Sequence, residues 1–180
     1  MKILILGSNG HLGKYFVDLL KSQKNVVIFT VSSSNSLEHR KNHSAIDLNK
    51  DIKKLYNLII KNNFNLIINC LLIKNIHNKF DTVIPKKIVN FLSRKKFKSI
   101  TWIEVSSYSI LLKHKNHYMI EKKRFELFLY NKFRNNLKNL KILRIGNFLE
   151  GQYLDKIFFF KFLNNIIIPS NPLNNIFLTN

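Results

Sequence analysis

Cysteine is almost absent from this chain. Cys70 stands alone, so no disulfide can close within the chain and no cysteine cluster can hold a metal. The six histidines show no metal-ligand spacing either, and we expect no metal. No apolar run approaches the roughly 20 residues that span a bilayer, and Gly7 and Gly10 interrupt the N-terminus where a cleavable leader would be apolar. These absences predict a soluble, cytoplasmic protein without a membrane span, and 180 residues give room for one domain with a core.

Acidic residues are also scarce, ten against thirty basic ones, which gives a formal charge of +20. A charge of this size raises the question of nucleic-acid binding. The basic residues are 25 lysines and five arginines spread along the chain, whereas base recognition favours the planar fork of arginine. We therefore expect no specific nucleic-acid partner, and only nonspecific adhesion to polyanions at low salt.

Apolar residues follow two alternating patterns along the chain. Short continuous runs, such as KILIL at residues 2–6, are typical of strands covered on both faces. Between such runs, apolar residues recur at helical spacing, as at Leu12, Tyr15, Phe16 and Leu19. The predicted strands are 2–6, 26–31, 45–48, 65–70, 100–105, 141–145 and 174–179, and the predicted helices are 11–22, 50–61, 83–96 and 117–131. Strands that alternate with helices imply right-handed crossovers and an α/β fold with a doubly wound parallel sheet.

A glycine-rich turn, GSNGHLG at residues 7–13, follows the first predicted strand and opens the first predicted helix. Its first glycine allows a tight turn, its second lets backbone N–H groups approach a pyrophosphate, and its third permits close helix–strand packing. The helix N-terminus adds unpaired donors and a positive dipole end. We expect it to bind the phosphates of a dinucleotide, unless the glycines merely turn the chain. The expected contacts are Gly7, Asn9, Gly10, His11, Leu12 and Gly13.

Tyr118 and Lys122 form a YxxxK pattern on the predicted helix 117–131. Residues four apart lie on one helix face, where an ammonium can help a phenol to exchange its proton nearer neutral pH. The plainer alternative is an amphipathic helix whose lysine reaches out to solvent. Ser106 and Ser107 end the preceding strand, where the catalytic groups of open α/β sheets collect. The alternative for this pair is a helix cap or a serine turn.

Taken in order, the glycine turn, the strand-end serines and YxxxK resemble the short-chain dehydrogenase/reductase superfamily. The likeness is greatest to its extended branch of epimerases, dehydratases and dTDP-4-dehydrorhamnose reductases. Asp47-Leu48 and the run NLIINC resemble that branch's acidic residue at the adenine and its Asn-Ala-Ala strand. Residues 143–151 resemble its Arg-x-x-Asn-x-x-Gly segment at the sugar site. The resemblance covers residues 1–151 and implies a Rossmann-type NAD(P)-binding domain, with 152–180 the start of a truncated or minimal substrate-binding part.

The resemblance also implies a role for each matched residue. Tyr118 is then the acid/base, and Ser107, or alternatively Ser106, polarises the reacting oxygen. Lys122 binds the nicotinamide ribose. The remaining matched positions, at the cofactor and at the substrate, are Asp47, Leu48, Asn69 and Asn147.

The end of the second predicted strand bears on the choice of cofactor. Val31 is followed by three serines, Ser32 to Ser34, and then by Arg40 and Lys41, with no carboxylate directly after the strand. NAD-preferring sites usually place a carboxylate there, on the ribose 2′-OH. We therefore expect NADP(H) over NAD(H), with Ser32 at the cofactor.

The implied function is an NAD(P)-dependent oxidoreductase or epimerase acting on a nucleotide-linked sugar, with hydride transfer and Tyr118 moving the matching proton. The alternative is a catalytically inactive NAD(P)-binding sensor or scaffold. It is motivated by departures from the family pattern: Cys70, Leu71 and Leu72 replace small residues beside the cofactor's path, and Ile84 replaces an active-site asparagine.

Two further expectations concern packing. The resemblance implies a homodimer paired through the helices on either side of the serine-bearing strand, with Phe91, Phe125 and Phe128 at the seam or, alternatively, packed on the sheet. Glu104 lies inside that strand and is expected to be an edge residue with a partner.

Overall fold

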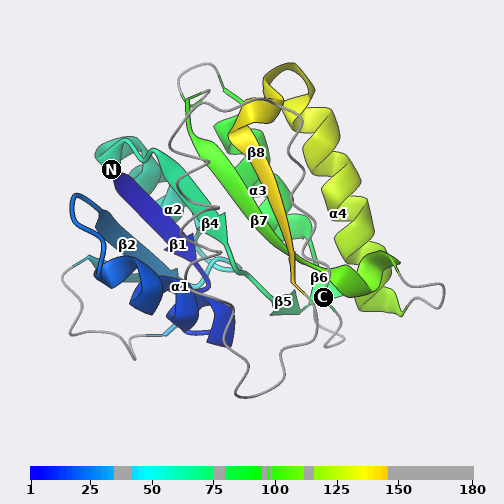
Figure 1. Cartoon of the computed structure of the whole chain (residues 1–180), viewed down its shortest axis with the longest axis horizontal. Helices are drawn as coiled ribbons and strands as arrows, with labels where there is room; N and C mark the ends of the chain where they lie inside the picture. Colours follow the sequence, from blue (N-terminus) through cyan, green and yellow to red (C-terminus); the bar gives the residue numbers. More distant parts are fainter. Residues whose placement is uncertain (35–41, 75–79, 95–96, 98, 112–115, 146–180) are drawn as a thin grey trace.

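A computed structural model describes residues 1–34, 42–74, 80–94, 97, 99–111 and 116–145 of the chain (Figure 1). The helices are α1 (His11–Lys21), α2 (Ile52–Asn62), α3 (Val83–Leu92) and α4 (His117–Phe133), and two short 3₁₀ segments are η2 (Tyr108–Leu111) and η3 (Arg134–Asn139). The strands are β1 (Lys2–Leu6), β2 (Val27–Ser32), β3 (His43–Ala45), β4 (Leu66–Asn69), β5 (Ile73–Lys74), β6 (Phe80–Asp81), β7 (Thr101–Ser107) and β8 (Leu140–Ile145).

The main sheet has six strands in the order β3-β2-β1-β4-β7-β8, and every pair in it is parallel. This is the strand order of the Rossmann fold, so the predicted doubly wound α/β class is confirmed. The chain leaves β1 toward β2 on one side and later returns to β4 on the other. The strand order therefore reverses between β1 and β4, which is where ligands bind in open α/β sheets.

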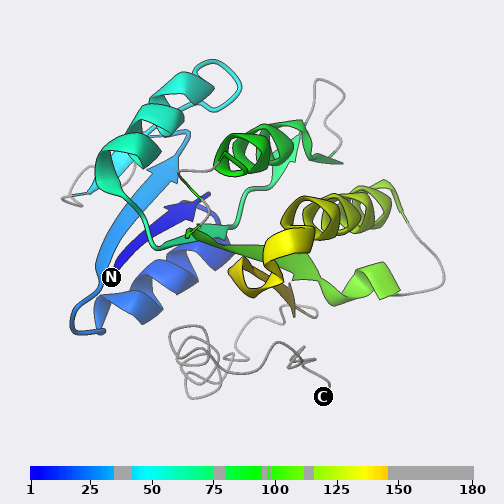
Figure 2. The same ribbon diagram turned by 90° about the horizontal axis from the view of Figure 1, so that it is seen from above.

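Helices cover both faces of the sheet (Figure 2). On one face, Phe16 and Leu20 of α1 pack against Ile3 and Ile5 of the central strand β1. The other face carries α2, α3 and α4, whose core side chains include Leu55, Ile88, Phe125 and Leu129. Alternate residues of β1 enter the two cores, because successive side chains of a strand point to opposite faces. Burying each such aliphatic or aromatic side chain contributes about 1.5–3 kcal/mol.

The aromatic residues expected at a dimer seam belong to this core. Phe91 and Phe125 are buried on the face of the sheet that carries α3 and α4, and Phe128 is partly buried against the same cluster. Of the two alternatives for these residues, packing on the sheet is the one that the structure adopts. Exposed apolar side chains of α4 are instead Ile120, Leu127 and Tyr130.

Several element boundaries differ from those predicted. The third strand is His43–Ala45 rather than 45–48, because Asp47 already belongs to a turn in which its carboxylate accepts the N–H of Asn49 at 3.0 Å. Strand β7 begins at Thr101 and ends with Ser106 and Ser107, so the expectation that the two serines end this strand is confirmed. Helix α3 ends at Leu92 rather than at residue 96. At this end, the Ser93 hydroxyl donates to the carbonyl of Asn90 at 2.8 Å.

Two features were not predicted at all. An antiparallel pair, β5 with β6, follows the end of β4. Helix α2 ends at Asn63, which adopts the left-handed conformation with φ of 49°. In the described part of the chain, no helix has the length and apolar character needed to cross a bilayer. The predicted strand 174–179, the part 152–180 and the segment 146–151 lie outside the described residues.

Candidate functional site

The three glycines of the turn between β1 and α1 have different reasons to lack a side chain. Gly7 has φ of +77°, and a Cβ on it would lie 2.7 Å from the carbonyl oxygen of Cys70. A Cβ on Gly13 would lie 2.2 Å from the carbonyl oxygen of Gly7. Both positions therefore require glycine for the chain's own packing. Gly10 has φ of −70° and ψ of 162°, which any residue adopts, and among the described residues its Cβ would meet nothing nearer than 3.5 Å.

Backbone hydrogen bonds fix this turn against the neighbouring strand. The N–H groups of Gly7 and Ser8 both donate to the carbonyl of Val31, at 2.9 and 3.1 Å, and the N–H of Gly10 donates to Gly7 at 3.1 Å. Gly10 is the N-cap of α1, and no side chain caps the helix there. The described residues thus leave the start of α1 without a side-chain acceptor or a first-turn acid. A helix start of this kind suits an anion.

The side chains of Asn9, His11 and Leu12 lie in three different environments. The Asn9 amide donates to the Ser34 hydroxyl at 2.7 Å and so ties the turn to the end of β2. His11 is exposed, while Leu12 is partly buried against the core under α1. Of the expected contact residues, Asn9, Gly10 and His11 therefore lie at the start of the helix, whereas Leu12 belongs partly to the core.

Ser32, expected at the cofactor, is buried and its hydroxyl donates to the Ser34 carbonyl at 2.8 Å. His43 of β3 organises the same strand end. Its Nδ1 lies 2.9 Å from the Thr30 hydroxyl, and its Nε2 lies 3.3 Å from the Ser34 carbonyl oxygen. Reasoning from the sequence missed this role of His43, because β3 comes into register with β2 only in the folded sheet. Arg40 and Lys41 lie outside the described residues.

Asp47 and Leu48 follow β3 in the turn that leads into α2. The Asp47 side chain is 40% exposed and forms an ion pair with Lys50 at 3.7 Å. Its carboxylate can therefore reach a ligand from the surface, whereas the Leu48 side chain is buried in the core under α2. Only the backbone of Leu48 is left to contact a cofactor.

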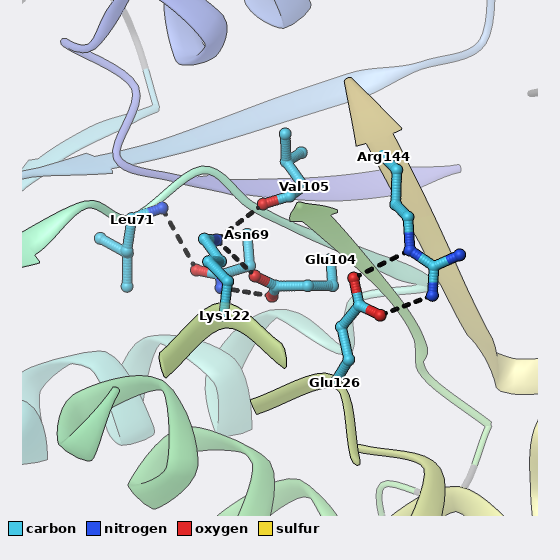
Figure 3. Close-up of polar contacts among 7 residues, drawn as sticks. All are labelled: Asn69, Leu71, Glu104, Val105, Lys122, Glu126 and Arg144. Carbon is cyan, nitrogen blue, oxygen red and sulfur yellow. Dashed lines mark hydrogen bonds and ion pairs between the residues drawn. The ribbon is translucent and has the colours of Figure 1, made fainter. Parts of the chain in front are cut away.

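A buried polar cluster joins β4, β7 and α4 (Figure 3). Lys122 donates to a carboxylate oxygen of Glu104 at 2.9 Å and to the Val105 carbonyl at 2.8 Å. The other carboxylate oxygen of Glu104 accepts the Asn69 amide at 2.6 Å. Asn69, expected at the cofactor, is thus buried on Glu104, and its own amide oxygen accepts the N–H of Leu71 at 3.4 Å.

The electrostatics of this cluster follow from burial and pairing. Burial alone lowers the pKa of Lys122, but the Glu104 carboxylate and its hydrogen bond outweigh burial, so the net shift is upward. The nearby Tyr118 phenol acts in the same direction. Burial acts in the opposite direction on the Cys70 thiol, whose pKa it raises, and Glu104 adds to that rise. Lys122 is therefore a cation that is paired with Glu104 inside the protein.

Glu104 is not an edge residue, because β7 lies between β4 and β8. The expectation that it has a partner is confirmed, and the expectation of an edge position is wrong. A second ion pair also joins α4 to the sheet: Arg144 donates to both carboxylate oxygens of Glu126, at 3.2 and 2.6 Å. Reasoning from the sequence missed both pairings, although a carboxylate inside the apolar run ITWIEV signals that a buried cation is needed.

The residues expected to form a Ser-Tyr-Lys set lie on β7 and α4. Tyr118 lies in the first turn of α4 and is partly buried, one turn before Lys122. The Ser107 hydroxyl lies 2.7 Å from that of Ser109 and accepts its N–H at 3.2 Å, which is a serine turn. The Ser106 hydroxyl is buried and, among the described residues, has no hydrogen-bond partner. Asn147 lies outside the described residues.

No protein-family model and no curated protein matches the sequence. Solved structures do share the fold. The UDP-glucuronic acid 4-epimerase from Bacillus cereus, in complex with NAD, has a TM-score of 0.64 at 15% identity, over 82% of this chain and 57% of that one. The dTDP-glucose 4,6-dehydratase from Bacillus anthracis, in complex with NAD, has a TM-score of 0.60 at 17% identity, over 92% and 62%.

An oxidoreductase from Lactococcus lactis has a TM-score of 0.60 at 20% identity, over 86% of this chain and 73% of that one. Structures with this fold therefore include an epimerase, a dehydratase and an oxidoreductase. This chain spans 57% and 62% of the length of the epimerase and the dehydratase. At these identities, the likeness establishes a Rossmann-type fold.

Proposed function

We propose that this chain binds a nicotinamide dinucleotide at the glycine turn and acts as an oxidoreductase or epimerase on a nucleotide-linked sugar. One observation carries the proposal. Gly10 lacks a side chain where the described part of the chain leaves room for one, at the start of α1, which no described side chain caps. A pyrophosphate that approaches the backbone at this point explains the missing Cβ, which the chain's own packing does not.

The position of the turn in the sheet supports the same proposal. Gly7 follows β1 directly, and Cys70 follows β4, so the turn lies where the strand order reverses. Ligands of open α/β sheets bind outside the carboxyl ends of the strands at this point. The epimerase and the dehydratase of the same fold were both crystallised with NAD.

Tyr118 is the proposed acid/base of the reaction. When bound, a nicotinamide supplies or accepts the hydride, and the phenol of Tyr118 moves the matching proton at the sugar oxygen. The hydroxyl of Ser106, which has no hydrogen-bond partner among the described residues, or that of Ser107 polarises that oxygen, and Asn147 holds the sugar. Removing only the hydroxyl in Tyr118→Phe should lower turnover by about 10²–10⁴-fold and leave dinucleotide affinity nearly unchanged. An active preparation that keeps its rate in this variant would show that the YxxxK match is accidental.

The dinucleotide site is tested directly by Gly10→Val. A valine there fills the space assigned to the pyrophosphate, and we expect the affinity for NADPH, followed by its fluorescence, to fall at least about 10-fold. Asp18→Val, on the exposed face of the same helix, is the matched control and should bind as the parent does. Thermal unfolding verifies that both variants are folded. Equal affinity of Gly10→Val and the parent would mean that the site lies elsewhere.

The choice between the two dinucleotides follows from the end of β2. The described residues there carry hydroxyls, Ser32 and Ser34, and no carboxylate. We therefore propose NADP(H) as the preferred form. Titration of the parent with NADPH and NADH compares the two, and tighter binding of NADH reverses the assignment.

A second candidate function is a dinucleotide-binding module without turnover. The observation that favours it is the ion pair between Lys122 and Glu104, which occupies the lysine of YxxxK inside the protein. A panel of nucleotide-linked sugars, offered with either dinucleotide, separates the two candidates. Binding without any oxidation or reduction favours the module.

We also propose a homodimer, with the exposed Ile120, Leu127 and Tyr130 of α4 as candidates for the contact in place of the buried phenylalanines. Light scattering at micromolar concentration tests it, and a monomer mass refutes it.

A further inference from the structure

Lys122 is enclosed by the protein rather than presented to a ligand. Its side chain is 5% exposed and that of its partner Glu104 is 1% exposed. The ammonium donates both to the Glu104 carboxylate and to the Val105 carbonyl, which lie on the strand beneath α4 (Figure 3). Two of the three N–H donors of the ammonium are thus used inside the protein, and because the side chain is only 5% exposed, a contact with a ribose hydroxyl requires it to move outward, away from these two acceptors.

Such a departure is unfavourable. It leaves the Glu104 carboxylate buried without its counterion, and the penalty for an uncompensated buried charge exceeds the gain from one charge-assisted hydrogen bond to a ribose. The second carboxylate oxygen does not remedy this, because the neutral Asn69 amide already occupies it at 2.6 Å.

We propose that Glu104 is a positioning residue that holds Lys122 as an internal counterion, so that a dinucleotide is bound here without a contact from Lys122. The inference rests on the proposed dinucleotide site and deepens it. It changes the role that the sequence resemblance implies for Lys122, from a ribose ligand to a structural cation between α4 and β7.

The same carboxylate also shapes the floor of the proposed site. Glu104 holds Asn69, and Asn69 accepts the N–H of Leu71. The carbonyl of Cys70, in the middle of this turn, lies against Gly7 at the start of the glycine turn. Through these contacts, Glu104 connects the helix that carries Tyr118 to the point between β1 and β4 where the strand order reverses.

The test compares the parent with the double variant E104Q/K122M. The glutamine of this variant still offers an oxygen to the Asn69 amide, and its methionine fills the volume of the lysine stem. The double variant therefore folds even where Lys122→Met alone does not. We expect its affinity for NADPH to stay within about 2-fold of the parent. A folded double variant that binds at least about 10-fold more weakly overturns the proposal, since Lys122 then contributes to binding.

A second readout does not depend on the dinucleotide. Amine labelling followed by mass spectrometry should modify Lys122 far more slowly than its exposed neighbour Lys123 in the parent, with and without NADPH. In Glu104→Gln, Lys122 loses the charge that keeps it protonated, and labelling should accelerate by about 10-fold or more. Equal labelling of Lys122 and Lys123 in the parent, or no acceleration in Glu104→Gln, overturns the role of Glu104.

Glu126→Gln is the matched control, because it breaks the other ion pair between α4 and the sheet. It should alter neither the affinity for NADPH nor the labelling of Lys122, and a change in both would mean that any loosening of α4 has the same effect. A parent that binds neither NADH nor NADPH refutes the proposed function, while the labelling still decides whether Glu104 holds Lys122.

Discussion

The glycine turn and the contact between α4 and the sheet are built in opposite ways. At the turn, the glycines have no side chains, and the backbone N–H groups of Gly7, Ser8 and Gly10 make the hydrogen bonds. Under α4, charged side chains are buried and paired, as Lys122 with Glu104 and Arg144 with Glu126. The start of α1 therefore remains available to the negative charge of a ligand, whereas the charges under α4 neutralise one another inside the protein.

This difference shows that a lysine's place in a motif does not decide what its charge does. Lys122 stands four residues after Tyr118, as the YxxxK pattern requires, yet a carboxylate on the neighbouring strand receives its ammonium. At the turn, by contrast, no side chain of the described residues caps α1. The two regions can be separated by variants that disturb one and spare the other.

The largest effect is expected from Lys122→Met. It leaves the Glu104 carboxylate buried without a counterion, which costs about 3–5 kcal/mol of the free energy of unfolding. Glu126→Gln should cost less, about 1–2 kcal/mol, because the Arg144 side chain left behind is 22% exposed to water. Urea unfolding measures both. Equal losses of the free energy of unfolding would mean that the difference in burial between the two ion pairs does not affect stability.

The next effect compares two glycines of the turn. Gly13→Ala places a methyl group 2.2 Å from the Gly7 carbonyl oxygen, and we expect a loss of about 3 kcal/mol, the upper end of the usual range for overpacking. Gly10→Ala has room for its methyl group and should cost less than about 1 kcal/mol. Thermal unfolding of the two variants tests this, and a Gly10→Ala as unstable as Gly13→Ala would remove the case for a ligand at Gly10.

Alkaline pH should weaken the α4 contact and spare the turn. Burial lowers the pKa of Lys122 but Glu104 raises it further, so the folded value lies above that of the unfolded chain. The stabilisation is then complete below the ordinary lysine pKa of about 10.4 and is lost as the pH rises through the folded value. Urea unfolding at about pH 8 and about pH 11 should show the parent's advantage over E104Q/K122M shrinking at the higher pH. If the parent's advantage in the free energy of unfolding is the same at both pH values, the pKa of Lys122 is not raised by folding.

The smallest effect concerns the two serines that end β7. Ser106→Ala removes a buried hydroxyl without a described partner and should leave stability unchanged or raise it by up to about 1 kcal/mol. Ser107→Ala removes the acceptor of the Ser109 N–H and should lower stability by about 1 kcal/mol. A loss in Ser106→Ala equal to that in Ser107→Ala would reveal a structural partner for Ser106.

The sequence was sufficient for features that depend on local constraints. Continuous apolar runs identified β1, β2, β4, β7 and β8, and glycine spacing located the turn, because Gly7 and Gly13 are each required by backbone geometry. The short β3 was misplaced because three residues carry little periodicity, and β5 and β6 have only two residues each.

Contacts between residues far apart in the chain could not be predicted from the sequence. Glu104 in an apolar run signalled a buried charge, but nothing in the chain indicated which of 25 lysines would neutralise it. The Asn69–Glu104–Lys122 cluster depends on the register of β4 with β7 and on the crossing of α4 above them. The role of His43 at the end of β2 likewise depends on the pairing of β3.

The central place of β1 in the sheet also bears on how the chain folds as it is made. Residues 2–6 are made before either of their partners, which are Val27–Ser32 on one side and Leu66–Asn69 on the other. At about 5–20 residues per second, the second partner is complete only about 3–13 s after β1 has been made. Until then, one edge of a continuous apolar strand stays unpaired, which is the condition under which nascent chains associate with one another or require a chaperone.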